Sequence, residues 1–380
     1  MAAKPRFDGE WVRLAESCEL VMGQSPVSSS YNTDGIGLPF YQGNADFGEV
    51  SPVARVWCTD PKKVAQPGDI LISVRAPIGA INIAAEKCCI GRGLAAIRPI
   101  GSNLDVDYLV HLFRASRHRI ESMGTGSTFK AVGKKVLSEL LIPVYCQERQ
   151  REIAFQLTRI IECIRASGEL ANELDSVVKS RFVEMFENDS LVERAQLKDI
   201  CSLITDGTHQ SPRFQGEGIP FLFVSNIADN KISYETTKFI SKEDYEALIA
   251  RTPIEVGDVL VSAVGSFGHP AIVKDERPFC FQRHIAYLKP IRERVNSSFL
   301  HAALLSEESQ QYMDKAAKGA AQRTVTLRSF KDLAVPLPPL ALQQEFADFA
   351  AEVDKSRFIV QQQIEKLQML YDSLAQEYFS

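Results

Sequence analysis

The chain has 380 residues, enough for two or three domains, and its 45% hydrophobic and 24% charged residues are typical of a globular protein. Its eight cysteines show no CxxC spacing and no apolar run approaches the roughly 20 residues that span a bilayer, so we expect no metal site, disulfide framework or membrane segment. The net charge of −5 gives no general preference for nucleic acid, and residues 1–9 lack a signal-peptide core, which predicts a cytoplasmic location.

The first 143 residues carry short strand patterns that are bounded by Gly, Pro and Asp. DILISV at 69–74, GAINIAA at 79–85 and GLAAIRP at 93–99 predict a twisted antiparallel core. The segment DVDYLVHLFRASRHRIESM at 105–123 spaces its apolar residues three and four apart, which predicts one helix. This region is therefore predicted to be an α+β domain.

A long helical pattern follows at 144–190. Its apolar residues recur at alternating steps of four and three, as in a coiled-coil seam. The seam of this segment consists of Ile153, Leu157, Ile160, Ile164, Leu174 and Val178, with Ser167 and Ala171 between them. Such a helix gains most of its stability from packing, so it needs an apolar partner elsewhere in the protein.

Residues 191–336 repeat the first region. RLAESCELVMGQSP around Leu14 matches QLKDICSLITDGTHQSP around Leu197, which pairs Ser25-Pro26 with Ser211-Pro212. PGDILISVRAPIG then matches VGDVLVSAVGSFG, and CIGRGLAAIRP matches CFQRHIAYLKP. The repeat predicts the same strands and one helix, over 296–316, in a second α+β domain. The offset between the copies drifts through small insertions, as expected of surface loops.

The last segment, 337–380, repeats the helical pattern of 144–190 without insertions, as expected of a helix with a fixed register. Its seam consists of Phe346, Val353, Val360, Ile364, Leu367 and Tyr371. Each helix is the obvious partner of the other, which predicts an antiparallel coiled coil. The alternative, that each seam packs on its own globular domain, remains open.

The predicted fold class is therefore α+β, with two globular domains in a tandem pseudo-repeat joined by two long helices. Counted from the sequence, the segments 1–143, 144–190, 191–336 and 337–380 carry net charges of +2, −3, 0 and −4. Because the acidity lies in the helices, they suit a protein partner better than DNA. Two similar domains on an antiparallel helix pair share an approximate two-fold axis, which matches the symmetry of a DNA duplex.

The ordered set of motifs, present twice, resembles the specificity subunits of type I restriction-modification systems over essentially the whole chain. The matching elements are RLAES and QLKDI, GDILIS and GDVLVS, GRGLAAIRP and QRHIAYLKP, and the late STFKAVGKKVLSELLIPV and AAQRTVTLRSFKDLAVPLPPLALQQE. One departure is IPVYCQERQ in the first half, where the second half has the more family-like VPLPPLALQQE. This departure concerns the junction between the first domain and its helix.

The resemblance implies two target-recognition domains that read an asymmetric, two-part sequence in double-stranded DNA. It also implies a complex with two methyltransferase subunits and, in the full assembly, motor-nuclease subunits. The chain itself is then no enzyme and holds no cofactor, since S-adenosylmethionine is expected on the methyltransferase subunits. In agreement, the sequence contains no GxxxxGK[ST] motif, no glycine-rich cofactor loop and no Asn-Pro-Pro-aromatic motif.

Residues that read bases carry donors and acceptors on loops or helix ends, with Arg or Lys suited to guanine and Asn or Gln to adenine. In the first domain we predict DNA contacts from Gln24, Ser25, Tyr41, Gln42, Asn44, Arg75, Arg92, Ser127, Thr128 and Lys130. In the second domain we predict them from Thr208, His209, Gln210, Arg213, Asn226, His269, Arg283, Gln322, Arg323 and Thr324. A solvated or structural role remains open for each, and a structural ion pair is slightly favoured for Arg92 and Arg283.

Two other functions remain open. The first is a duplicated coiled-coil adaptor that spaces two protein-binding domains, which the near-neutral charge of the domains would allow. The second is a self-contained restriction or modification enzyme, which the missing cofactor motifs disfavour. The three histidines His111, His118 and His301 fall on predicted helices, and we expect surface or packing roles for them.

Overall fold

The computed structural model describes residues 9–125, 130–187, 192–319 and 322–380. Within these ranges no helix is both long and apolar enough to cross a membrane.

By its internal contacts the chain divides into two compact units. The first unit contains residues 1–168 and 361–380, and the second contains residues 169–360. Each unit therefore combines one globular domain with the neighbouring ends of two long helices, α5 (Gln147–Phe182) and α11 (Leu340–Phe379).

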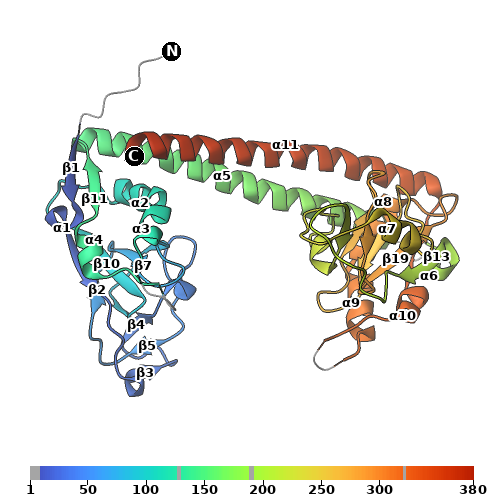
Figure 1. Cartoon of the computed structure of the whole chain (residues 1–380), viewed down its shortest axis with the longest axis horizontal. Coiled ribbons are helices and arrows are strands. Elements are labelled where there is room, and N and C mark those ends of the chain that lie inside the picture. Colours follow the sequence, from blue (N-terminus) through green and yellow to red (C-terminus); the bar gives the residue numbers. More distant parts are fainter. Residues whose placement is uncertain (1–8, 126–129, 188–191, 320–321) are drawn as a thin grey trace, which may run out of the picture. The chain divides into compact units, whose positions relative to one another are not determined.

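The globular domain of the first unit has the predicted α+β composition, with sheets and helices in separate layers (Figure 1). Its main sheet is antiparallel with the strand order β2-β10-β7-β8, and it contains all three predicted strands. A second sheet, β3-β5-β4-β9-β6, includes the parallel pair β4 and β9, and β1 pairs with β11. The elements are β1 (Glu10–Arg13), α1 (Leu14–Ser17), β2 (Cys18–Met22), β3 (Tyr31–Asn32), β4 (Leu38–Tyr41), β5 (Trp57–Cys58), β6 (Val64–Ala65), β7 (Ile70–Ser73), β8 (Ile81–Ile83), β9 (Cys88–Ile90), β10 (Leu94–Pro99), α2 (Val106–Ala115), α3 (Arg117–Ser122), α4 (Lys134–Ser138) and β11 (Leu141–Val144).

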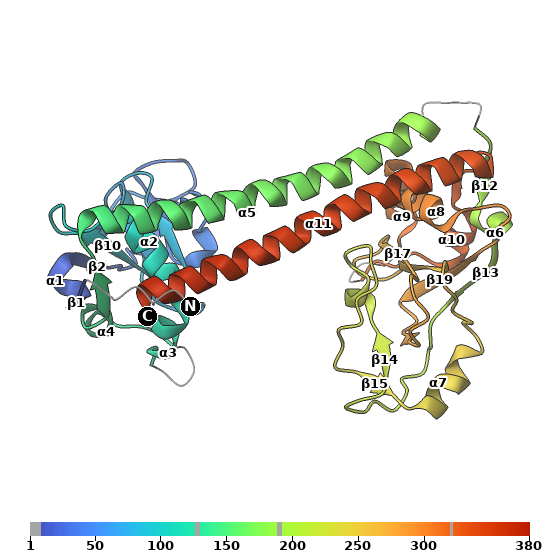
Figure 2. The ribbon, with the colours of Figure 1, turned by 90° about the horizontal axis from the view of Figure 1, so that it is seen from above.

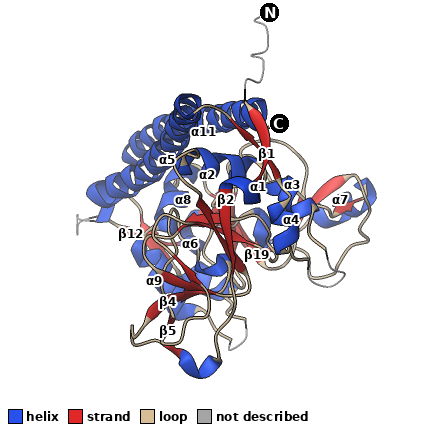
Figure 3. Ribbon diagram, turned by 90° about the vertical axis from the view of Figure 1, so that its left-hand side faces the viewer, coloured by secondary structure: helices blue, strands red, loops and turns tan. Residues whose placement is uncertain are grey.

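The main sheet of this domain is buried on both faces. Ile70 and Ile72 pack into a core with Tyr108 of α2, whereas Leu71 points to the opposite face and packs with Ile90. The uninterrupted apolar run of β7 follows from this placement, because side chains alternate between two covered faces. Helix α2 lies between this sheet and α5 (Figures 1 and 3).

The globular domain of the second unit repeats this topology. Its main sheet has the order β13-β19-β16-β17, and the pairs β12-β20 and β14-β18 correspond to β1-β11 and β4-β9. The internal repeat predicted from the sequence is therefore a repeat of the fold. The elements are β12 (Arg194–Gln196), α6 (Leu197–Ile200), β13 (Cys201–Asp206), β14 (Ile219–Leu222), β15 (Phe239–Ile240), α7 (Lys242–Ile249), β16 (Val259–Ser262), β17 (Pro270–Ile272), β18 (Cys280–Phe281), β19 (Ile285–Pro290), α8 (Ser297–Leu305), α9 (Glu307–Ala316), α10 (Leu327–Asp332) and β20 (Ala334–Pro336).

The prediction of one helix in each domain after the last strand of the main sheet is wrong in detail. The structure has two helices there in each domain, α2 and α3 or α8 and α9, and the break falls at Ser116 or Ser306. Ser306 adopts an extended ψ of 150° and accepts a hydrogen bond from the Ser309 amide, so it caps the second helix. Serine competes well for such cap positions, which periodicity alone does not register.

Every seam residue predicted on the long helices is buried or half-buried. In the first unit, Ile153 and Leu157 of α5 join the core of the globular domain, together with Tyr371 of α11. The Tyr378 hydroxyl of α11 donates a hydrogen bond to Oε1 of Gln156 on α5 at 2.9 Å, so these helix segments lie side by side (Figure 2). At this end the seam of α5 packs on its own globular domain, as one of the two interpretations predicted, whereas Tyr371 of α11 packs on the first domain and not on its own.

In the second unit, Phe346 of α11 and Phe182 of α5 lie in an aromatic cluster with Phe299 of the globular domain. Further along, Arg357 of α11 contacts Asp175 of α5 at 2.8 Å. Arg181 contacts Glu345 at 3.2 Å, so residue numbers rise along one helix as they fall along the other. The two helix segments of this unit therefore run antiparallel.

Candidate nucleic-acid interface

One edge of the first domain gathers loop residues from three strand ends. Strands β2 and β7 run antiparallel to β10, so the ends of β2 and β7 lie where β10 begins. This edge brings together Ser25 after β2, Arg75 after β7 and Arg92 before β10. Their grouping follows from the antiparallel topology and not from their separation in sequence.

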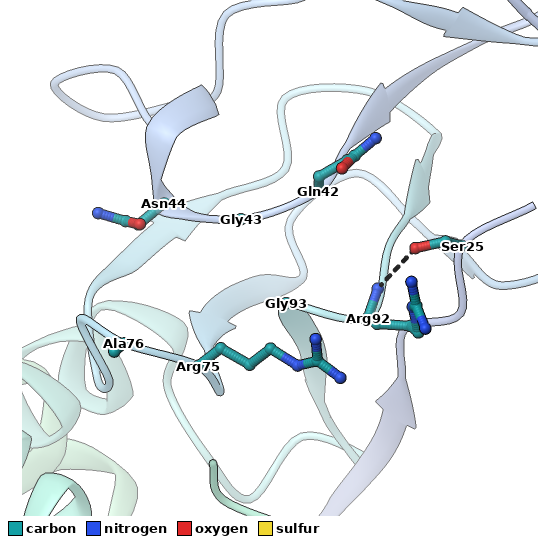
Figure 4. A pocket seen from close by; sticks show the side chains of 8 residues that line it. All are labelled: Ser25, Gln42, Gly43, Asn44, Arg75, Ala76, Arg92 and Gly93. Carbon is teal, nitrogen blue, oxygen red and sulfur yellow. Dashed lines mark hydrogen bonds between the residues drawn. The ribbon is translucent and has the colours of Figure 1, made fainter. Parts of the chain in front are cut away.

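The edge contains a pocket of about 190 Å³ (Figure 4). Gln42 and Asn44 lie on one side of it, and Arg75 and Arg92 lie on the other. The pocket is lined by Ser25, Gln42, Gly43, Asn44, Arg75, Ala76, Arg92 and Gly93. The structure thus brings five of the predicted contact residues of this domain into one site.

Gly93 fixes the shape of this pocket. Its amide donates a hydrogen bond to the Gln42 carbonyl at 3.1 Å, and a Cβ on Gly93 would lie 2.2 Å from that oxygen. The close approach of the two backbone segments therefore requires glycine. On the opposite side, the Arg92 amide donates to Oγ of Ser25 at 3.3 Å, which ties the loop after β2 to the same turn.

Arg75 and Arg92 are both exposed, and within the described ranges neither forms an ion pair with a carboxylate. Arg283 is likewise exposed and without a carboxylate partner among the described residues, so the structural ion pair that we favoured for Arg92 and Arg283 is wrong for both. Arg98 shows the contrast, because its guanidinium contacts the buried carboxylate of Asp69 at 2.7 Å and raises its own pKa through that hydrogen bond. The pocket thus presents guanidinium donors that no carboxylate of the described residues neutralises.

A hairpin adds a third cation to this edge. Ala131 pairs with both Thr125 and Arg75, which places Lys130 next to the pocket. Lys130 is exposed and has no ion-pair partner among the residues that the structure describes. The predicted contacts Ser127 and Thr128, which precede Lys130 in the sequence, lie outside the described residues.

The second domain has an equivalent edge. The Gly207 amide donates to the carbonyl of Ile285, as the Gly23 amide does to Leu94, and a Cβ on either glycine would lie 2.2 or 2.1 Å from a carbonyl oxygen. This equivalence puts His209 in the place of Ser25. The sequence pairing of Ser25-Pro26 with Ser211-Pro212 is therefore wrong by two residues, because it assumed three inserted residues where the irregularity between Cys201 and Leu203 of β13 adds only one.

The hairpin of the second domain differs from the first in its charge. Arg323, the equivalent of Lys130, contacts Asp314 at 2.7 Å and lies over the ring of Phe267 at 5.3 Å. Gln322 is exposed on the same hairpin, and Thr324 pairs with Val264. The guanidinium of Arg323 must leave Asp314 before it can contact a phosphate fully.

Three predicted contacts have structural roles instead. Tyr41 is only 4% exposed and packs in the core of the first domain. Asn226 is buried, accepts a hydrogen bond from the Phe223 amide at 2.9 Å and donates to two carbonyls, so its amide is fully used inside the fold. His269 is half-buried and bonded to Ser266 and Asn230. Asn226 satisfies buried backbone groups, and Tyr41 contributes to a core; sequence patterns cannot separate such uses from base contact.

A second pocket, of about 260 Å³, lies at the edge of the second domain. Thr208, His209 and Gln210 line it, as predicted contacts. The prediction missed Asp206, which contacts His209 at 2.9 Å, and Arg251, which lies 3.9 Å from Asp206. Arg251 follows α7, a helix without a counterpart in the first domain, and the longer segment after β14 was the only sequence signal for it.

The remaining predicted contacts, Gln24 and Arg213, are exposed and lie on the loops that follow β2 and β13. Of the three histidines, His118 is exposed, whereas His111 and His301 have packing roles. Burial lowers the pKa of His301, whose ring contacts the carbonyls of Asn230 and Pro270.

A tandem pair of α+β domains with polar, cation-bearing loop edges defines a class of protein that carries two similar recognition modules on long helices. The model of the type I restriction modification DNA specificity domain matches residues 8–176 and 190–369. The chain belongs to this family and to its type I restriction-modification specificity subunits, as the repeated motifs predicted.

Individual relatives agree with this assignment. The chain is 41% identical over 161 residues to the putative type I restriction enzyme MjaX specificity subunit of Methanocaldococcus jannaschii, a match that covers 42% of this chain but only 38% of that protein. The MjaVIII specificity subunit of the same organism is 21% identical, with 91% of this chain and 86% of the relative covered. A solved type I restriction-modification system S subunit from M. genitalium shares the fold, with a TM-score of 0.55, 16% identity and coverage of 100% and 98%.

Proposed function

We propose that this chain is the DNA-reading subunit of a type I restriction-modification complex, in which each globular domain reads one half of an asymmetric, two-part sequence in double-stranded DNA. The observation that carries the proposal is the edge of the first domain, where Arg75, Arg92 and Lys130 lie together without carboxylate partners among the described residues. Guanidinium and ammonium groups held in this way suit phosphates and the acceptor edge of guanine. Amide side chains in the same pocket add the donor and acceptor pair that adenine needs.

The two long helices would act as a ruler between the two half-sites. We propose that they form an antiparallel coiled coil, which the buried seam residues and the antiparallel contacts between Asp175 and Arg357 support. A coiled coil is stiff over this length, so it would fix the separation of the halves and hence the length of the unread spacer.

The outer faces of the helices fit a role in binding partner subunits. Phe358 and Ile359 of α11 are 62% and 64% exposed, and Phe155 and Leu170 of α5 are 68% and 45% exposed. Large exposed apolar side chains between acidic residues are typical of a protein interface. We propose that two methyltransferase subunits bind here and bring S-adenosylmethionine, that motor-nuclease subunits join through them, and that this chain supplies no catalytic group or cofactor of its own.

The proposal is tested by expressing the chain with its neighbouring methyltransferase subunit in a host without DNA methylation and mapping methylated bases by long-read sequencing. The expected result is one new methylated motif with two unequal halves and a fixed gap. The same map from cells with the methyltransferase subunit alone provides the control. No new motif from a purified, intact complex would contradict DNA reading and would favour the adaptor that spaces two protein-binding domains.

A further inference from the structure

The two domains of this chain share some features of the candidate DNA-binding edge and differ in others. Arg92 and Arg283 are equivalent, because each follows a residue whose amide donates to the end of the parallel strand, Gly91 to Tyr41 and Gln282 to Leu222. The distances are 2.8 and 3.1 Å. Both arginines are exposed and have no carboxylate partner in the described parts of the chain.

Arg75 has no such counterpart. Ala131 pairs with Arg75 in the first domain, and Thr324 pairs with Val264 in the second, so Val264 occupies the place of Arg75. The residue before each of them, Val74 or Ala263, donates its amide to the turn before β10 or β19, which confirms the equivalence. An arginine in one domain is therefore an apolar residue in the other.

The pocket itself is also particular to the first domain. Its floor requires Gly93, which is replaced in the second domain by His284, a residue with a side chain at the position where Gly93 admits none. Only the first domain can thus bring the backbone of Gln42 against this turn. The guanidinium of Arg75 and the glycine-dependent backbone that shapes the pocket therefore occur together, in the first domain.

A feature that both domains share cannot make them prefer different sequences, whereas a feature that only one domain has can do so. The shared Arg92 and Arg283 fit contacts with phosphate, which carry no sequence information. Arg75 lies in a donor-rich pocket whose lining contains no carboxylate, so its ligand must be rich in acceptors. The O6 and N7 atoms of guanine offer two acceptors at the spacing of a guanidinium fork.

On the basis of the proposed function, we propose that Arg75 is the residue of the first domain that reads guanine, and that the second domain has no equivalent reader. The target half read by the first domain then contains a guanine whose recognition depends on this one side chain. Phosphate shares the acceptor chemistry of guanine, and the experiment below separates the two.

The test is a selection of binding sequences from a pool of DNA duplexes with a randomised centre, using the full chain in complex with its methyltransferase subunits. The variants are Arg75→Val, which installs the residue of the second domain, and Arg75→Lys, which keeps the charge but removes the fork. Arg13→Val provides the control, because it removes an exposed arginine near the opposite end of β2. Each selected duplex is then tested with 7-deazaguanine, which lacks the N7 acceptor, at the guanine in question.

We expect the wild-type complex to select a two-part motif and Arg75→Val to lose its preference for guanine at one position of one half, by about 5- to 150-fold. Arg75→Lys should recover only part of this preference, and Arg13→Val should select the wild-type motif. The 7-deazaguanine duplex should weaken binding of the wild type but not of Arg75→Val.

An unchanged motif with Arg75→Val would overturn the proposal. Equal weakening at all sequences, with a salt dependence reduced by about one phosphate contact, would also overturn it and assign Arg75 to the DNA backbone. If the wild-type complex selects no motif at all, the proposed function fails, and the reading role of Arg75, which rests on it, is overturned with it.

Discussion

His111 makes the stability of the first unit dependent on pH. Its ring is only 2% exposed and connects three helices, because Nδ1 of His111 lies 2.9 Å from the Tyr371 hydroxyl of α11 and Nε2 lies 2.9 Å from Oγ1 of Thr158 on α5. Burial, together with the nearby Arg114, lowers the pKa of His111 from 6.5 to about 4. The folded unit therefore holds this imidazole in its neutral form.

The unfolded chain binds a proton at His111 with the ordinary pKa of 6.5, whereas the folded chain resists protonation until about pH 4. Between these values the unfolded state binds more protons, so the free energy of unfolding falls as the pH falls. A shift of this size lowers the free energy of unfolding by about 2 kcal/mol between about pH 7 and about pH 5, and by about 3 kcal/mol at most. Above about pH 7.5, where the unfolded chain is also almost fully deprotonated at this histidine, the contribution of His111 no longer varies with pH.

The measurement is urea unfolding followed by tryptophan fluorescence at about pH 7 and about pH 5. Both tryptophans of the chain, Trp11 and Trp57, belong to the first unit, so the signal reports on this unit alone. His111→Gln keeps a neutral donor and acceptor but does not titrate, and it should lose about 2 kcal/mol less than the wild type between the two pH values. His118→Gln is the matched control, because the side chain of His118 is 97% exposed. Equal losses in the wild type and in His111→Gln would refute the argument.

Three further predictions concern packing, electrostatics and assembly. Gly23→Ala should destabilise the first unit by about 3 kcal/mol, since the new Cβ would lie 2.1 Å from a carbonyl oxygen, whereas the new Cβ of Gly133→Ala would meet nothing within 4 Å and should change little. Equal unfolding midpoints for the two variants would contradict this. Lys130→Ala should weaken DNA binding and lower its salt dependence by about one phosphate contact, and Arg323→Ala should have a smaller effect because Arg323 is held in an ion pair with Asp314. Binding titrations at several salt concentrations measure both effects, and equal effects would show that the ion pair does not hold Arg323 back from DNA. Phe358→Glu should reduce co-purification of the methyltransferase subunit, while an unchanged melting temperature would show that the chain still folds. Undiminished co-purification would place the docking surface elsewhere.

The charged residues of the helices provide a second probe of that docking surface. Because the acidic helices suit a protein partner, charge reversal at Glu162, Glu169 or Glu365 should also impair assembly with methyltransferase subunits. In the structure Glu162 already contacts Arg159 at 2.9 Å, so reversal there also breaks an exposed ion pair of small energy. The apolar Phe358 is the cleaner test, because it is 62% exposed and carries no charge whose ion pair its replacement would break.

The sequence predicted the strands and helices whose signals are local. The run DILISV became β7, and the constant register of the two helical patterns became α5 and α11, because periodicity reflects which side chains of an element face its neighbours. Duplication then predicted a second domain with the same strand order, which β13-β19-β16-β17 confirms. Local patterns did not predict the helix break at Ser306, since one serine in an amphipathic run changes the period very little.

The individual DNA contacts could be predicted only in part, for a different reason. A polar side chain in a loop either faces solvent or satisfies a buried group. The sequences around Asn226 and Gln42 do not show which of these two roles applies. Asn226 proved to be enclosed by three hydrogen bonds, whereas Gln42 lines an open pocket. Asp206 and Arg251 escaped notice because they lie 45 positions apart in the sequence, with α7 between them.

By itself, the sequence determined that this protein is a tandem repeat of two α+β domains followed by long helices with apolar seams, since repeats and periodicities are written in the order of residues. Only the tertiary structure decided which polar groups share a site. Arg75, Arg92 and Gln42 meet because antiparallel strands end at a common edge and because Gly93 lets two backbones touch. It also decided that His111 is buried and neutral, because His111 contacts α5 and α11, two helices that lie far from it in the sequence. A local sequence pattern does not predict contacts over such separations.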